Sequence, residues 1–175
     1  MANCGSVTLS AIDARCETSF GGIKRVLVAL RDDVTVTKDE TGITAITLGE
    51  GKKFVEWQFR KNTGSLTSTV TSDTAIGNTF ATTEVSLQFS KAEATKRLAI
   101  QSAINASAVV IVEDMYGQYI YLGLENEVVV SSATMVTGTA AADLNGFTLV
   151  FQDIATKLPY FVDATLIEGL TVTKG

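Results

Sequence analysis

Residues 90–107 read SKAEATKRLAIQSAINAS and carry a helical pattern between long runs of strand-like sequence. Ser90, followed three residues later by Glu93, is typical of a capping box, in which each side chain accepts a hydrogen bond from the other residue's backbone N–H. The apolar residues that share one face at helical spacing are Ala92, Ala99, Ile100, Ala103 and Ile104. The stretch predicts a single helix, over about residues 91–106, that lies on a sheet.

The residues before this helix, 62–89, carry Ser or Thr at many alternate positions. Thr67, Thr69 and Thr71 would share one face of a strand, and Gly77 with Asn78 can reverse the chain. Thr favours extended structure without supplying an apolar core. The segment predicts a long polar hairpin that projects partly from the body, with a long flexible loop as the alternative.

Apolar runs typical of strands fill much of the remaining chain. Strands are expected over residues 24–30, 34–37, 43–48, 53–60, 108–115, 118–123, 127–131, 133–139, 147–152 and 167–173. In 53–60, alternation puts Val55, Trp57 and Phe59 on the side expected to face the core. The expected fold is mainly β, an antiparallel β sandwich or barrel with one flanking α-helix, and residues 1–175 are expected to form a single domain.

The net charge of the chain indicates which kinds of partner it can bind. Nucleic-acid affinity comes largely from Lys and Arg, whereas this chain has a net charge of −5 and a pI near 4.7. An acidic surface of this kind would let DNA pass without binding it. Only 19% of the residues are charged, against roughly 25% in an average globular protein. This composition favours a subunit that buries part of its surface against copies of itself, although a compact monomer with a Thr-rich surface fits too.

No catalytic, cofactor-binding or metal-binding residues are expected. The chain contains 0 His, which excludes Ser-His-Asp and Cys-His hydrolase mechanisms. The adjacent carboxylates are interpreted as surface turn acids: Asp32 with Asp33, Asp39 with Glu40, and Glu113 with Asp114. Residues 143–146, DLNG, resemble part of a calcium loop, but Ile154 stands where the bidentate Glu is needed, so a turn is expected. An enzyme is not expected.

The ends and cysteines of the chain indicate cytoplasmic synthesis. Residues 1–10 lack the pattern of a signal peptide, and no stretch has the roughly 18 consecutive apolar residues of a membrane span. Neither a secretion signal nor a membrane anchor is therefore expected. Cys4 and Cys16 are expected to be reduced thiols, with a disulfide or a metal role as alternatives.

The order of elements over residues 89–152 resembles the major tail tube proteins of tailed bacteriophages. The resemblance is carried by SKAEATKRLAIQSAINAS (90–107), AVVIVEDMYGQYIYLG (108–123), EVVVSS (127–132) and DLNGFTLVFQ (143–152). Cys16 and the segment GGIKRVLVAL (21–30) resemble structural proteins of phages infecting Bacteroidota-like hosts. These are similarities of order and composition.

The resemblance implies a virion structural protein of the phage tail. Such a subunit self-assembles into rings, hexameric in that family, which stack into a tube whose lumen conducts DNA during ejection without sequence-specific binding. Its further partners would be other tail or connector proteins. The hairpin at 62–89 would then pair with a neighbour's open sheet edge.

Two alternatives stay open. One is a head-tail connector, a tail terminator or another virion structural protein. The other is a carbohydrate-binding β-sandwich module, which would use exposed aromatic side chains; the candidates are Trp57, Tyr116, Tyr119 and Tyr121.

Overall fold

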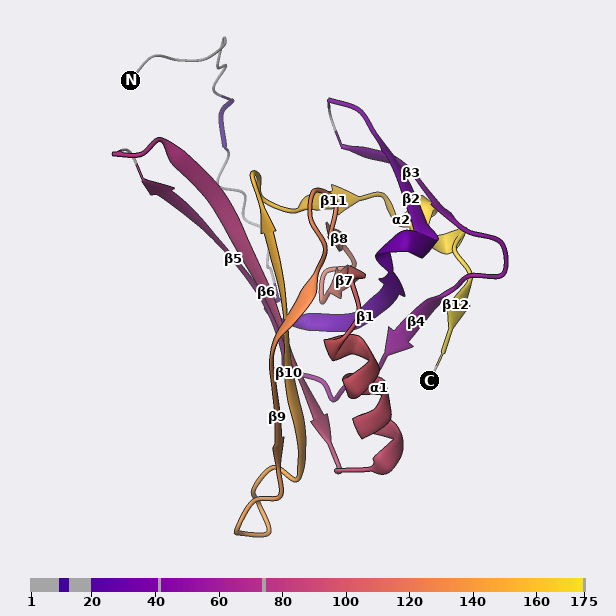
Figure 1. Cartoon of the computed structure of the whole chain (residues 1–175), viewed down its shortest axis with the longest axis vertical. Helices are drawn as coiled ribbons and strands as arrows, with labels where there is room; N and C mark the ends of the chain where they lie inside the picture. The colour runs from indigo at the N-terminus through magenta and orange to yellow at the C-terminus, as the bar shows by residue number, and fades with distance from the viewer. Residues whose placement is uncertain (1–9, 13–19, 41, 74, 175) are drawn as a thin grey trace.

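The computed structural model describes residues 10–12, 20–40, 42–73 and 75–174. The chain is mainly β, with antiparallel sheets and one main helix, as predicted (Figure 1). The described strands form open sheets and do not close into a barrel, so of the two predicted architectures the sandwich fits. Cys4 and Cys16 lie outside the described residues.

Two sheets and a small hairpin make up the described strands. The body sheet has the order β11 (Tyr160–Val162), β8 (Tyr119–Leu122), β7 (Ala108–Asp114), β1 (Ile23–Leu30), β4 (Phe54–Trp57) and β12 (Val172–Thr173). The long sheet has the order β5 (Gly64–Asp73), β6 (Asn78–Ser90), β10 (Gly146–Ala155) and β9 (Val129–Val136). The small hairpin consists of β2 (Val34–Lys38) and β3 (Ile43–Leu48).

The body sheet is the middle layer, covered on both faces. One face meets the inner side of the long sheet and α1 (Ala94–Ile104); the other meets the small hairpin and α2 (Ala164–Glu168). Strand β7 therefore reads as a continuous apolar run, AVVIV, in which side chains of both faces are buried. The first core contains Val110, Leu87 and Phe151, and the second contains Ile111, Leu27 and Phe54.

The predicted helix exists, but it begins later than expected. Ser90 is the last residue of β6 and pairs with Gly146, so its backbone continues the strand. Lys91 then turns the chain with a φ of 67°. Glu93 becomes the N-cap without a side-chain capping bond, so the predicted capping box is wrong. Strand pairing of Ser90 outweighs the local capping preference.

The predicted apolar face of the helix is confirmed only in part. Ile100 and Ala103 are buried against the first core, and Ala92, just before the helix, packs on the same core. Ile104 is 41% exposed, which contradicts its predicted core position. Ala99 is also at the surface, where it lines a groove described below.

In β4, the prediction that one face is buried and the other faces solvent was wrong. Phe54, on the side expected to face solvent, is fully buried, whereas Val55 is 45% exposed. Because the body sheet has a core on each side, alternation along β4 alternates between two cores rather than between core and water. Trp57 does pack on the first core, against Phe89 and Phe151.

The long polar hairpin is formed by β5 and β6, paired without interruption from Gly64↔Leu87 to Asp73↔Asn78. Gly77, in the predicted turn, has a φ of +74°, a conformation that favours glycine. Gly64 lies so close to Ile23 and Phe59 that a Cβ there would be 2.7 Å from each of these side chains. The base of the hairpin is therefore tightly packed, while its outer end projects beyond the body (Figure 1).

Two further strands differ from the prediction. The segments 127–131 and 133–139 are largely one strand, β9, which carries an irregularity in its pairing with β10. The predicted strand 167–173 is confirmed only at its end, as β12, because Ile167 lies in the short helix α2. Asp163 caps this helix by accepting the backbone N–H of Thr165. A one-turn 3-10 helix, η1 (Arg31–Asp33), joins β1 to β2. Within the described part of the chain, neither helix has the length and hydrophobicity that crossing a membrane requires.

Candidate functional site: open sheet edges and a groove beside the helix

The long sheet ends in two open edge strands, β5 and β9. Each is hydrogen-bonded to a neighbouring strand on one side only, among the residues described. All pairings within this sheet are antiparallel, so β5 and β9 run in opposite directions. The unpaired N–H and C=O groups of an edge strand form a template for another strand. The molecule therefore presents two edges that a strand of another molecule can extend.

These edges lack the features that usually prevent pairing. Natural edge strands carry Lys, Pro or inward-pointing charges, which disfavour contact with another sheet. Strand β9 reads VVSSATMV, without a charged residue or proline, and β5 reads GSLTSTVTSD, with Asp73 at its outer end only. The composition of both edges thus favours strand addition.

The outer face of the long sheet is polar and nearly uncharged. The side chains that the register places there are Ser65, Thr67, Thr69, Thr71, Asp73, Asn78, Phe80, Thr82, Glu84, Ser86, Gln88, Ser90, Val129, Ser132, Thr134, Val136, Thr148, Val150, Gln152 and Ile154. Asp73 and Glu84 are the charged residues among them, and Glu84 accepts a 3.1 Å hydrogen bond from Gln152 Nε2. Phosphate groups are bound chiefly by Lys and Arg. Because this face has no Lys or Arg, it gives a nucleic acid no such partner.

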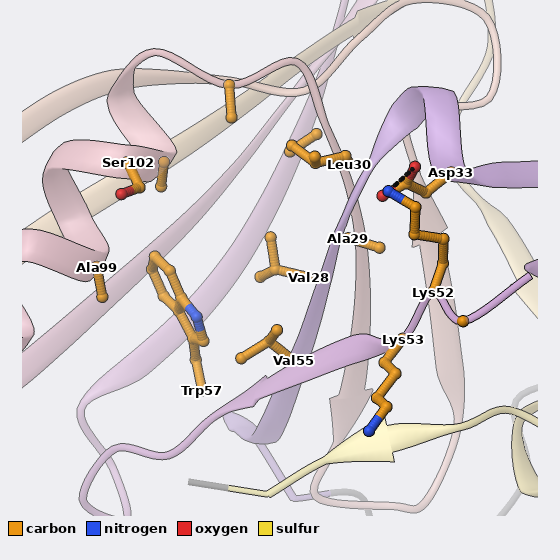
Figure 2. A pocket seen from close by; sticks show the side chains of 14 residues that line it. Val28, Ala29, Leu30, Asp33, Lys52, Lys53, Val55, Trp57, Ala99 and Ser102 are labelled. Carbon is orange, nitrogen blue, oxygen red and sulfur yellow. Dashed lines mark ion pairs between the residues drawn. The ribbon is translucent and has the colours of Figure 1, made fainter. Parts of the chain in front are cut away.

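A mainly apolar groove lies between α1 and the strands β1 and β4. It has a volume of about 470 Å³, and its lining includes Val28, Val55, Trp57, Ala99, Ser102 and Ala103. A second hollow of about 290 Å³ shares Val55, Trp57 and Ala99 with it. Figure 2 shows Trp57, Val28 and Val55 across this space from Ala99 and Ser102. We call this space the helix groove; it is open because α1 faces it with small side chains.

A buried carboxylate organises one end of the body sheet. Glu113, in β7, is 4% exposed and pairs with Arg25 and, at 2.7 Å, with Lys24. Arg25 also donates a 2.8 Å hydrogen bond to Tyr119. Burial alone would raise the pKa of Glu113, but the hydrogen bonds and charges of Lys24 and Arg25 outweigh it and lower the pKa. This arrangement serves the stability of β1 and β7.

A second buried carboxylate lies where the two sheets meet. Asp153, on the inner side of β10, accepts a 3.2 Å hydrogen bond from the backbone N–H of Gly123, and its other oxygen has no hydrogen-bond partner. Burial raises its pKa, and the charge of Glu125 adds to this; Gly123 and the charge of Arg31 oppose it. Arg31 holds the same loop by donating to the carbonyl oxygens of Gly123, at 2.5 Å, and Asn126, at 2.6 Å.

The predicted surface acids have different fates. Asp33 pairs with Lys52 at 3.0 Å, and Asp39 accepts the N–H of Gly42 at 2.9 Å. Asp114 caps the β7–β8 turn, as predicted, whereas its neighbour Glu113 points the other way and is buried, so the prediction of a surface acid there is wrong.

The DLNG segment forms the predicted turn. Asp143 Oδ2 accepts the backbone N–H groups of Thr139 and Ala140, both at 2.8 Å. These bonds lower the pKa of Asp143. Within the described residues, no cluster of three or more His, Cys, Asp or Glu side chains has a geometry that could hold a metal ion.

The aromatic candidates for sugar binding do not form an exposed platform. Tyr119 and Tyr121 are buried, and Trp57 is half-buried against two Phe rings. Tyr116 is exposed in the β7–β8 turn. The side chains that the carbohydrate hypothesis needs are thus occupied by core packing, with Tyr116 as the exception.

No family model, curated protein or solved structure matches the chain. The function is therefore inferred from the open sheet edges and the helix groove. Sequence reasoning missed the helix groove and the edge position of β9. The uncharged stretch 129–136 was the available signal for an unprotected edge, but strand order is set by contacts distant in sequence.

Proposed function

We propose that the chain is a self-assembling virion structural protein, a tail tube subunit that forms stacked rings around a DNA-conducting lumen. The observation that carries the proposal is the long sheet with two unprotected, oppositely directed edges. Six subunits per ring is the number that the resemblance to tail tube proteins implies. The protein would act in the tail of the virion after synthesis in the host cytoplasm.

Strand direction supports ring formation. Because β5 and β9 are antiparallel, a copy rotated about an axis along the strands brings its β9 beside β5 of the first copy and continues the antiparallel alternation. Such a contact joins two different surfaces, and a contact of that type closes into a ring when the rotation divides a full turn. Each subunit would then satisfy the open edges of two neighbours.

The faces of the long sheet support a lumen. Its inner side is fixed by the first core, so the outer face would line the inside of a ring of joined sheets. That face carries hydroxyl, amide and apolar groups and two acidic residues, Asp73 and Glu84, but no Lys or Arg. DNA would pass such a wall without the counterion release that makes binding to basic surfaces strong. The role needs no catalytic residue or cofactor, and other tail or connector proteins would close the ends.

The experiment compares two proline variants of the β9 edge, Ala133→Pro and Thr134→Pro. Consecutive residues of a strand point their N–H groups to opposite sides, so one proline removes a bond to β10 and the other removes an edge donor. We expect the edge-facing variant to keep its fold by circular dichroism and to lose rings in negative-stain microscopy. The variant facing β10 is the control, because it should lose stability instead.

Wild-type protein that stays monomeric over a concentration series by light scattering would contradict self-assembly. Rings that do not stack would favour a connector or terminator. A stable monomer that binds glycans would favour the carbohydrate-binding module.

A further inference from the structure

We propose that the helix groove receives the outer end of the β5–β6 hairpin of another copy of this chain. This outer end, the hairpin tip, comprises the described residues 70–73 and 75–80. The inference rests on the proposed self-assembly and names the contact that would join one ring to the next. It concerns the exposed side chains of the tip and the groove, whereas the ring contact uses the backbone edges of β5 and β9.

The hairpin tip exposes apolar side chains that its own molecule leaves uncovered. Val70 is 50% exposed, Ile76 is 69% exposed and Phe80 is 40% exposed. A projecting hairpin of Ser and Thr has no need of these three residues for solubility or for strand pairing. Their exposure costs free energy that burial against a partner would recover, since removing apolar surface from water is favourable.

The placement of these side chains fits a groove better than a flat surface. Val70 follows Leu66 and Ser68 on the inner side of β5, whereas Phe80 pairs with Thr71 on the outer side. The two apolar residues therefore lie on opposite faces of the hairpin, and Ile76 lies at its end. Only a site with two walls can cover both faces at once.

The helix groove has two such walls. The strand side presents Val28, Val55 and Trp57, and the helix side presents Ala99 and Ala103. Small side chains on α1 leave the room that larger ones, such as Phe80 and Ile76, would fill. The groove thus offers space lined by apolar groups, and the tip has exposed apolar side chains that could fill it.

The charges of the tip and the groove are opposite in sign. The hairpin from Gly64 to Ser90 contains Asp73 and Glu84 but no Lys or Arg, so its tip is acidic. Lys52 and Lys53 both line the groove at one end (Figure 2). Lys52 is paired there with Asp33, which also lines the groove, so Lys53 would be the partner of an acidic tip. An acidic tip entering a groove flanked by Lys is favourable, and two like-charged surfaces would have repelled each other.

The occupant must be a second copy. The hairpin extends away from the body, and α1 lies at the opposite side of the molecule from its tip (Figure 1). Strand pairing from Gly64 to Asp73 holds the hairpin in this direction, so it does not fold back onto its own groove. A copy displaced along the tube axis can bring its groove to the tip.

Disulfide trapping between two differently tagged proteins tests the contact. Both carry Cys4→Ser and Cys16→Ser; one adds Ile76→Cys at the tip, and the other adds Ser102→Cys in the groove. After mixing and oxidation, we expect a disulfide-linked heterodimer on non-reducing gels, at least 10-fold more abundant than with Gln101→Cys. Gln101 is the matched control because it is exposed on the same helix outside the groove.

The outcomes separate this inference from the proposed function. Rings or tubes in microscopy without the tip-to-groove heterodimer overturn the docking and leave self-assembly standing. Equal disulfide trapping at Gln101→Cys and Ser102→Cys also overturns it, because docking in the groove brings the tip close to Ser102 and not to Gln101. Absence of any assembly overturns both proposals.

Filling the groove provides an independent readout. Ala99→Trp places a bulky side chain in the groove, whereas Leu98→Trp adds the same bulk at an exposed position outside it. We expect Ala99→Trp to form rings but lose at least 10-fold in tube length, and Leu98→Trp to form tubes like the wild type. Long tubes of Ala99→Trp, with the subunit folded by circular dichroism, would contradict the proposal.

Discussion

The body sheet and the long sheet differ in what covers them. Strand β7, in the middle of the body sheet, has six buried residues followed by one half-buried one, whereas β9, at the edge of the long sheet, has no fully buried residue. Both strands are rich in β-branched and small residues, although β7 ends in Glu113 and Asp114 and β9 contains Met135. The difference is thus one of position: a strand with a core on each face serves stability, and a strand with a free face and a free edge is available for partners.

Strand β10 has one side chain that faces the core next to one that faces outward, so substitutions in it test the difference between a covered and a free face directly. Phe151 points into the first core and contacts Trp57 with ring centroids 5.5 Å apart, while Val150 points to the outer face. We expect Phe151→Ala to lower the free energy of unfolding by about 3–5 kcal/mol, the usual cost of a large cavity. Val150→Ala should cost under about 1 kcal/mol. Urea unfolding of dilute protein measures both.

A similar loss in the two variants would contradict the assignment of an inner and an outer face to the long sheet. Assembly gives a second contrast, because Val150→Ala changes a side chain of the proposed lumen wall but no edge. Its rings should therefore form as in the wild type.

The body sheet also contains an ion cluster that the long sheet lacks. We expect Glu113→Gln to lower the free energy of unfolding at pH 7 by about 2 kcal/mol, because the charged hydrogen bonds of Lys24 and Arg25 lose their acceptor charge. Lys24 is largely exposed, so water limits its share. Thermal unfolding at a series of pH values measures the effect.

The pH dependence follows from the lowered pKa of Glu113. The stabilisation is fully present above the ordinary pKa of 4.5 and is lost as pH falls through the lower pKa of the folded state. The gap between wild type and Glu113→Gln should therefore close below about pH 4.5. A constant gap down to pH 3 would assign the loss to packing rather than to charge.

Local patterns in the sequence predicted the elements better than their partners. The hairpin turn at Gly77, the β7–β8 hairpin and the Asp143 turn depend on neighbouring residues, so the sequence was sufficient for them. The helix boundary failed because Ser90 pairs with Gly146, which is remote along the chain. Phe54 was misassigned because a second core, unknown from alternation alone, covers its side of β4.

The proposed assembly surfaces were harder to predict from the sequence than the individual strands. The uncharged segment 129–136 was visible, but its edge position depends on the strand order of the sheet. The helix groove depends on Trp57 and Ala99 meeting across two elements. Such juxtapositions carry no local pattern, since each residue alone is typical of a core or a helix.

Asp153 is expected to have a smaller effect on stability than Glu113, and one of opposite sign. Its pKa is raised by burial, so its contribution to stability is fully present below the ordinary pKa of 3.8 and is lost as pH rises through the folded value. Asp153→Asn keeps an acceptor for the N–H of Gly123 and removes the buried charge. We expect it to raise the free energy of unfolding by about 1 kcal/mol at pH 7, with no gain at pH 3.

Asp143→Asn is the matched control, because the N–H groups of Thr139 and Ala140 lower the pKa of that exposed carboxylate. It should be neutral or destabilising at pH 7, where Asp153→Asn stabilises. Urea unfolding of both variants at pH 7 and pH 3 gives the comparison. If Asp153→Asn instead destabilises at pH 7, the charge of Asp153 holds the Gly123 loop against the long sheet. The junction of the two sheets would then depend on an ion as the body sheet does, and the contrast between the sheets would rest on burial alone.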